Sequence, residues 1–166
     1  GVDLNATLIG DGDQKASLEQ LIAERGVGAR VKMLGPRDQA EVRGFMSRAA
    51  IMVQPCLVGN DGNRDALPTV LIESLAMKLP SISTPVTGIP EILDQGRCGV
   101  LVPENDVQAT ADAIEALLRD PARREKIAVD GRKRAEELFD SEKTSRILSD
   151  WFDQALEGGR ACASSA

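Results

Sequence analysis

AIMVQPCLVGNDGNRDALPTVLIESLAMKLPSIST, residues 50–84, is the stretch that decides the fold of this chain. Two short apolar runs, 50–54 and 80–84, enclose a polar, glycine-rich loop at 55–67 and an apolar segment of helical length at 68–78. Short apolar runs that alternate with helical segments are typical of parallel β-α-β units. The stretch therefore predicts two parallel strands that are joined by a largely buried helix.

The same alternation continues on both sides of this unit. Further strands are expected at 4–9, 30–34 and 99–102, and further helices at 13–25, 38–48 and 89–95. After the last strand the pattern is wholly helical, and it predicts helices at 106–118, 121–138 and 141–156. Candidate N-caps are Asp38, Asp106, Asp120 and Ser141. We expect an α/β, Rossmann-like fold, with a parallel sheet covered by helices on both faces.

The length and the tail set the domain organisation. A chain of 166 residues fits a single core. Residues 158–166 have small and polar side chains with nothing to bury, so we expect them to be frayed. The predicted organisation is one domain over residues 1–157, followed by a disordered tail.

Composition excludes several functions. No apolar run approaches the ~20 residues that a membrane span needs. The net charge of −6 and the 2% aromatic content oppose nucleic-acid binding, which uses basic surfaces and stacking rings. Cys56, Cys98 and Cys162 lie far apart and there is no histidine, so neither a disulfide framework nor a metal site is indicated. A cytoplasmic protein without nucleic-acid partners is expected.

Loops at the carboxyl ends of parallel strands are the candidate ligand sites. In Gly10-Asp11-Gly12, the two glycines let the backbone approach a ligand, but Lys15 stands where the dinucleotide-binding fingerprint needs a third glycine. Gly35-Pro36-Arg37 offers backbone groups and a guanidinium that can stack on a base. Simple structural turns explain both loops equally well.

The loop at 55–67 leads into the helix at 68–78, whose apolar surface is interrupted by Glu73. A carboxylate on a buried helix needs a partner. One interpretation is that the free N–H groups at the helix start face an anionic ligand and that Asp65 is a second acceptor in the same cleft. The alternative is a solvated stripe made of Thr69, Glu73 and Lys78.

Four motifs, in matching order and spacing, closely resemble those of the retaining glycosyltransferases of group 1 type, which carry two Rossmann-like domains in the GT-B arrangement. The motifs are Ile9-Gly10-Asp11-Gly12, the acid-to-glutamate run from Asp65 to Glu73 followed by Leu79–Thr84, Gly88-Ile89-Pro90-Glu91, and Gly96–Pro103. The resemblance covers residues 3–140. The Asn63-Arg64-Asp65 version of the loop is similar to members that build exopolysaccharide or lipopolysaccharide.

The resemblance implies that this chain is the donor-binding, C-terminal half of such an enzyme, with a nucleotide-sugar as substrate and with no cofactor or metal. It implies that Glu73 holds the ribose hydroxyls of the donor and that Asp65, the candidate catalytic residue, contacts the transferred sugar. The residues implied to bind the sugar and diphosphate are Ala66, Leu67, Pro68, Thr69 and Val70, and those near the base and phosphates are Gly10, Gly12, Gly35 and Arg37.

The family's phosphate-binding arginine and lysine belong to a first strand-helix unit upstream of the position of Gly1. The resemblance therefore implies a missing first unit, a missing N-terminal acceptor domain, weak nucleotide affinity and an inactive isolated chain. Peripheral association of the full-length enzyme with the inner face of a membrane is left open. The departures from the family pattern are Asp65 in place of glutamate, Ala66-Leu67 in place of glycine and an aromatic residue, and Lys78 in place of glycine.

Two other functions remain open at this point: a non-catalytic nucleotide-binding module and a nucleotide-sugar epimerase of the same architecture. A receiver-like signalling domain is disfavoured, because the strand at 50–54 ends in Gln54-Pro55 without an aspartate. In the helix at 141–156, apolar residues recur at helical spacing, with Trp151 and Phe152 among them. The family's terminal helix crosses to the other domain, so we expect this stripe to be partly exposed.

Overall fold

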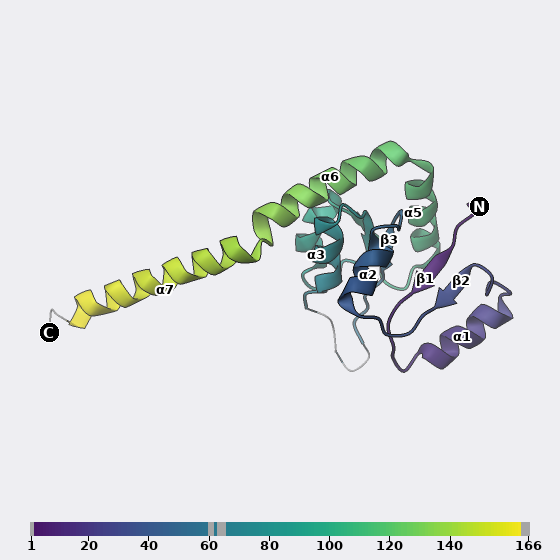
Figure 1. Ribbon diagram of the computed structural model, residues 1–166, viewed down its shortest axis with the longest axis horizontal. Coiled ribbons are helices and arrows are strands. Elements are labelled where there is room, and N and C mark those ends of the chain that lie inside the picture. Colours follow the sequence, from purple (N-terminus) through teal and green to yellow (C-terminus); the bar gives the residue numbers. More distant parts are fainter. Residues whose placement is uncertain (1, 60–61, 63–65, 164–166) are drawn as a thin grey trace.

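Residues 2–59, 62 and 66–163 are described by a computed structural model, in which parallel strands and helices alternate along the chain (Figure 1). The strands are β1 (Ala6–Leu8), β2 (Val31–Met33), β3 (Met52–Gln54), β4 (Ser81–Ser83) and β5 (Val100–Leu101). The helices are α1 (Lys15–Glu24), α2 (Gln39–Met46), α3 (Thr69–Ala76), α4 (Ile89–Ile92), α5 (Val107–Arg119), α6 (Pro121–Leu138) and α7 (Ser141–Ala163). A short 3-10 turn, Asp94–Gly96, follows α4.

The predicted strands are all present and all parallel, but they form two sheets where a single sheet was expected. β1 pairs with β2 in one sheet, whereas β3, β4 and β5 follow one another in the second. In a doubly wound sheet, successive strands add outward from a central strand in two directions. β1 is the first strand of one such series and β3 is the first strand of the other. No strand in the described part of the chain lies between β1 and β3 and pairs with both.

Helices cover both faces of the larger sheet, as predicted. Successive side chains of a strand point to opposite faces. On β4, Ile82 packs in a core cluster with Leu117 of α5, while Ser81 on the other face places its Oγ 2.6 Å from the Oγ of Ser74 in α3. α3 and α5 therefore lie on opposite faces of β4.

Aspartate caps fix three of the helix starts that were predicted. The carboxylates of Asp38, Asp106 and Asp120 each accept a hydrogen bond from the N–H three residues on, at the starts of α2, α5 and α6. The predicted cap Ser141 is wrong, because Asp140 does this for α7: its Oδ1 accepts from the N–H groups of Glu142 and Lys143.

Burial is concentrated in the second half of the chain. Between residues 2 and 45 no residue is buried, and Met46 is the first that is. The fully buried side chains, such as Leu71, Ile82 and Leu117, belong to the three-stranded sheet and its helices. The unit formed by β1, α1 and β2 therefore adds little to the core.

Helix α7 extends away from the rest of the molecule (Figure 1). Trp151 and Phe152 are 64% and 62% exposed, which confirms the expected exposure of this stripe. Helix α7 runs to Ala163, and the frayed tail expected from residue 158 stays a prediction. No helix in the described ranges combines the length and apolar character that crossing a bilayer requires.

Candidate functional site

The loops after β1 and β2 meet at the carboxyl ends of these strands. The N–H of Gly10 donates a 3.1 Å hydrogen bond to the carbonyl oxygen of Gly35. Both residues have a positive φ, +134° at Gly10 and +69° at Gly35, which L side chains rarely adopt. Glycine is therefore required for the joined form of the two loops.

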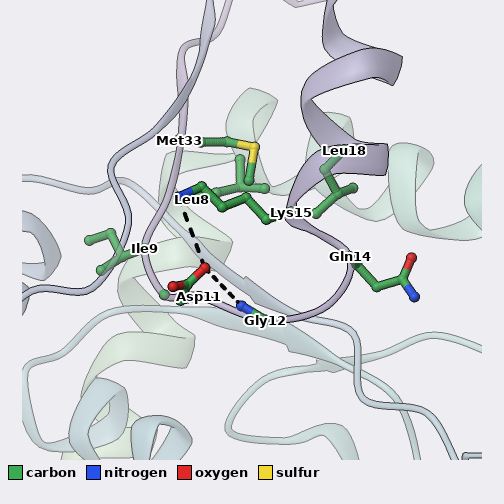
Figure 2. A pocket seen from close by; sticks show the side chains of 9 residues that line it. Leu8, Ile9, Asp11, Gly12, Gln14, Lys15, Leu18 and Met33 are labelled. Carbon is green, nitrogen blue, oxygen red and sulfur yellow. Dashed lines mark hydrogen bonds and ion pairs between the residues drawn. The ribbon is translucent and has the colours of Figure 1, made fainter.

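A hollow of about 220 Å³ opens beside these loops (Figure 2). Its wall is formed by Leu8, Ile9, Gly10, Asp11, Gly12, Gln14, Lys15, Leu18 and Met33. The Asp11 carboxylate accepts a 3.1 Å hydrogen bond from the N–H of Gly12 and lies 4.0 Å from the Lys15 ammonium (Figure 2). The hollow thus combines apolar side chains with one acid and one base, a mixture that suits a small polar ligand.

Arg37 does not line this hollow. Its Nη1 donates to the carbonyl oxygen of Pro36 at 2.8 Å, and its Nε lies 3.6 Å from Glu41 Oε1. The guanidinium is thus engaged by its own loop and by α2. The structure brings Gly10, Gly12 and Gly35 together and leaves Arg37 apart from them.

The start of α3 is the second part of the candidate site. Pro68 is the N-cap residue, and no side chain among the described residues caps the helix. The first N–H groups of a helix have no partner within it and attract an anion. Thr69 is exposed and Val70 half-buried, so the first turn of α3 is accessible. Asp65 lies outside the described residues, and its expected place beside Glu73 stays a prediction.

Glu73 lies in the middle of α3 and is half-buried. Its neighbours Leu71, Ser74 and Leu75 are at most 2% exposed. Among the described residues, no hydrogen bond or ion pair to the Glu73 carboxylate is formed. The solvated stripe is not continuous, because Lys78 lies beyond the end of α3 in a left-handed conformation with φ +57°. A half-buried carboxylate without a partner is suited to accept hydrogen bonds from a ligand.

Gly88, which precedes α4, contacts the chain just before α3. A Cβ on Gly88 would lie 3.0 Å from the carbonyl oxygen of Ala66 and 3.8 Å from Leu67 Cδ1. Its φ is −80°, so glycine is needed here for the close approach and not for the torsion. The sequence showed the Gly88–Glu91 motif but assigned it no role. Only the tertiary contact reveals that Gly88 supports the predicted donor-binding turn.

Hydrogen bonds also join the loops at the carboxyl ends of β3, β4 and β5. Thr84 Oγ1 donates to the carbonyl oxygen of Cys56 at 2.5 Å, next to β3. The N–H of Val58 donates to Glu104 Oε2 at 3.2 Å, which ties the long loop to the residues after β5. Sequence analysis missed both contacts, because a lone threonine and a lone glutamate after a strand carry no specific signal.

A second hollow, of about 240 Å³, is lined by charged side chains of α6 and of the segment that follows α4. Hydrogen bonds from Arg97, together with the nearby charge of Arg134, lower the pKa of Asp94. Burial raises the pKa of the Cys98 thiol, which keeps it protonated and unreactive. No group of three acidic or cysteine side chains that could hold a metal ion occurs in the described ranges.

Comparisons with known proteins give the family context of this geometry. The family model described as glycosyl transferases group 1 matches residues 1–134. The chain is similar to the amylovoran biosynthesis glycosyltransferase of Erwinia amylovora, with 32% identity over 148 residues, which cover 89% of this chain and 36% of that protein. Other relatives are glycosyltransferases of capsular polysaccharide and lipopolysaccharide core biosynthesis. The chain spans little more than a third of the length of the first relatives it matches.

Solved structures show the same fold. The C-terminal domain of a glycosyl transferase group 1 family protein from Francisella tularensis is 25% identical, with a TM-score of 0.69, and the match covers 82% of this chain and 70% of that one. HepE of Anabaena, in complex with UDP-glucose, is 22% identical, with a TM-score of 0.78 and coverage of 90% of this chain and 41% of that one. The fold is that of GT-B glycosyltransferases, as expected.

Proposed function

The chain belongs to the glycosyl transferases group 1 family, and we propose that it is the donor-binding, C-terminal half of a retaining glycosyltransferase that uses a nucleotide-sugar. The observation that carries this proposal is the half-buried Glu73 carboxylate, which has no partner among the described residues and lies on a helix whose first turn is accessible. Similarity to the solved C-terminal domain of a glycosyl transferase group 1 family protein supports the assignment to the donor half.

In this proposal, Glu73 accepts hydrogen bonds from the two ribose hydroxyls of the donor. One carboxylate can accept from two neighbouring hydroxyls, and such charge-assisted bonds are about twice as strong as neutral ones. The amides from Ala66 to Val70, except at Pro68, bind the sugar and diphosphate, since they lie at the positive end of α3. Asp65 contacts the transferred sugar.

The hollow beside Gly10, Gly12 and Gly35 is proposed to take the base and the adjoining phosphate. Its apolar wall suits a flat ring. Glycine has no side chain, so an anion can come close to the backbone N–H groups of the loop. Arg37 can join this site only after it leaves Pro36 and Glu41. We propose that arginine and lysine side chains of a first strand-helix unit, rather than a metal ion, neutralise the diphosphate.

The separation of the two sheets supports a further strand-helix unit upstream. The open edges of β1 and β3 leave main-chain N–H and C=O groups without strand partners. A parallel strand placed between them would join the two sheets into one doubly wound sheet. We propose that the first strand-helix unit of the domain supplies this strand and that an N-terminal domain binds the acceptor.

The proposed acceptor is a growing polysaccharide or lipid-linked glycan, in exopolysaccharide or lipopolysaccharide synthesis. Relatives named for capsular polysaccharide and lipopolysaccharide core biosynthesis support this acceptor class. The proposed location is the cytoplasm, with the full-length enzyme at the inner face of the membrane where a lipid-linked acceptor is used.

Binding and transfer can be tested on the full-length protein that contains this chain. UDP-glucose is a suitable first probe, because a protein of the same fold holds it. Calorimetry with UDP- and GDP-sugars should identify one donor, and NMR of the product formed on a glycan acceptor should show the anomeric configuration of the donor. Absence of binding for all donors, or transfer with inversion, would contradict the proposal.

The rival functions predict different products. A nucleotide-sugar epimerase releases free product from the donor without an acceptor, and a non-catalytic module binds the nucleotide but yields neither free nor transferred sugar. Incubation of the full-length protein with donor, with and without acceptor, therefore separates all three functions in one experiment.

A further inference from the structure

Three arginines of α6 bind the carbonyl ends of three other helices. Arg124 donates to the carbonyl oxygens of Leu117 and Leu118 in α5, at 2.6 and 2.8 Å. Arg132 donates to the carbonyl oxygen of Ala76 in α3, at 2.5 Å. Arg134 donates to the carbonyl oxygens of Glu91 and Ile92 in α4, at 3.1 and 3.0 Å. The last carbonyl groups of a helix have no partner within it, and cations bind them favourably. Helix α6 thus fixes the ends of α5, α3 and α4.

Arg134 makes the most extensive of these contacts. Its Nε is shared between the carbonyl oxygens of Glu91 and Ile92, its Nη2 also donates to Glu91, and its Nη1 lies 3.3 Å from Asp94 Oδ1. The side chain is 18% exposed, so the guanidinium is held inside the molecule. The planar group can bind two carbonyls and a carboxylate at once because of its several fixed donors.

Helix α4 depends on such external support. It has four residues, far fewer than a helix needs to be stable by itself. One residue beyond its end, after Leu93, Asp94 and Gln95 have φ values of +53° and +54°. Left-handed conformations of non-glycine residues persist where the surroundings hold them. Arg97 and Arg134 both bind the Asp94 carboxylate and provide that hold.

The other end of α4 contacts the candidate donor site. Gly88 approaches the Ala66 carbonyl so closely that an added Cβ would lie 3.0 Å from it. Ile89 and Ile92, at most 1% exposed, pack in one core cluster with Leu71 of α3. A shift of α4 would therefore move the turn at Ala66, which directly precedes the start of α3.

We propose that Arg134 is a positioning residue of the donor site: by binding the carbonyl end of α4, it holds Gly88 against the turn at Ala66. This proposal rests on the proposed donor-binding function. Arg134 touches neither the donor nor the reacting atoms, and it acts through α4 on the amides of residues 66–70.

Kinetics of the full-length enzyme test the proposal. Arg134→Met removes all the hydrogen bonds, and Arg134→Lys keeps the charge but cannot bind both carbonyls and Asp94 together. We expect KM for the donor to rise about tenfold in Arg134→Met and less in Arg134→Lys, with KM for the acceptor unchanged, because misplacement of a binding turn weakens one substrate only.

Arg124→Met is the matched control. It removes the same kind of cap from α5, Val107–Arg119, which carries none of the proposed donor-site residues. It should lower the Tm as Arg134→Met does and leave the donor KM unchanged. Equal donor KM values in the two methionine variants would overturn the proposal, and so would a similar rise of the acceptor KM in Arg134→Met. If Arg134→Met does not fold, the comparison is made with the two lysine variants, Arg124→Lys and Arg134→Lys.

Amide hydrogen exchange separates this proposal from the proposed function, because it needs no donor. The amides to follow are those that are hydrogen-bonded in the wild type: Leu71, which donates to the carbonyl oxygen of Pro68 at the start of α3, and Ile89, Ile92 and Leu93 around α4. In Arg134→Met or Arg134→Lys these amides should exchange faster, whereas those of α5 should not. Unchanged exchange at Leu71 would overturn the positioning role, even in an enzyme that binds its donor. A wild-type enzyme that binds no nucleotide-sugar would overturn the donor function, while faster exchange would still show the structural coupling.

Discussion

The N–H of Gly10 donates to the carbonyl oxygen of Gly35 at 3.1 Å, and this bond joins the loops after β1 and β2 across their sheet. The two residues are 25 positions apart in sequence, and both have backbone torsions that favour glycine. The loop after β1 lines the hollow in which we place the base of the donor, and this bond ties it to the loop after β2.

Substitution of Gly10 by alanine should distort this junction through torsion alone, since nothing lies within 4 Å of an added Cβ. We expect a loss of about 1–3 kcal/mol, the usual cost of a strained backbone conformation, in the free energy of unfolding by urea. Gly12→Ala is the matched control, because Gly12 has equal space and no positive φ. Equal stability of the two variants would contradict a torsional requirement at Gly10.

Glu73→Gln should weaken donor binding without loss of stability. The change keeps the side-chain shape but removes the charge, and hydrogen bonds to charged groups contribute about 1.5–3 kcal/mol, or roughly 10- to 100-fold in Kd. Calorimetry with the identified donor and a thermal melt of the same samples measure both effects. Glu125→Gln, on the exposed face of α6, should change neither. A lower Tm with an unchanged Kd would assign Glu73 a structural role.

Sequence predicted the features that depend on local chemistry. The aspartate caps of α2, α5 and α6 were predicted correctly, because a cap involves residues three positions apart. Gly10 and Gly35 were placed correctly at strand ends, because each follows its own apolar run. The exposed face of α7 was expected from the family resemblance.

Features that depend on distant parts of the chain were not predicted. The strands are two or three residues long where four to six were expected, because pairing needs a partner and ends where the neighbouring strand diverges. The contact of Gly88 with Ala66, and the cap that Arg134 places on α4, join segments 22 and more than 40 residues apart. No local pattern in the sequence reports such contacts.

Asp94→Asn should be less stable than the wild type near neutral pH, and this difference in stability should disappear in acid. Asparagine tolerates the left-handed conformation as aspartate does, so the change isolates the charge. Arg97 and Arg134 hold the pKa of Asp94 below its ordinary value. The stabilisation is therefore complete above the ordinary pKa of about 3.9 and is lost as the pH falls through the lower folded value.

The measurement is the Tm of wild type and Asp94→Asn at a series of pH values from neutral to strongly acid. The difference in Tm between the two proteins should stay constant down to about pH 5 and then fall to zero at lower pH. Asp153→Asn, on exposed α7, controls for the loss of one negative charge. A gap that widens in acid would contradict the assigned ion pair.

The apolar face of α7 should cause the isolated chain to self-associate. Trp151 and Phe152 are more than half exposed, and burial of each ring contributes on the order of 2 kcal/mol. Analytical ultracentrifugation should show concentration-dependent association, with a blue shift of the emission of Trp151, the single tryptophan. The double change Trp151→Ser and Phe152→Ser should abolish association, whereas Val107→Ser, at an isolated valine that is 82% exposed, should not. A monomer at every concentration would exclude an interaction surface here.

The absence of buried residues between positions 2 and 45 links ligand affinity to folding. The β1-α1-β2 unit has little core to hold it, so a ligand at the Gly10 and Gly35 loops must also order the backbone around it. Part of the intrinsic binding free energy is then spent on this ordering, and the measured affinity is weaker than the contacts alone would give. An upstream strand that joins the two sheets would tighten binding without touching the ligand, because it would do the ordering in advance.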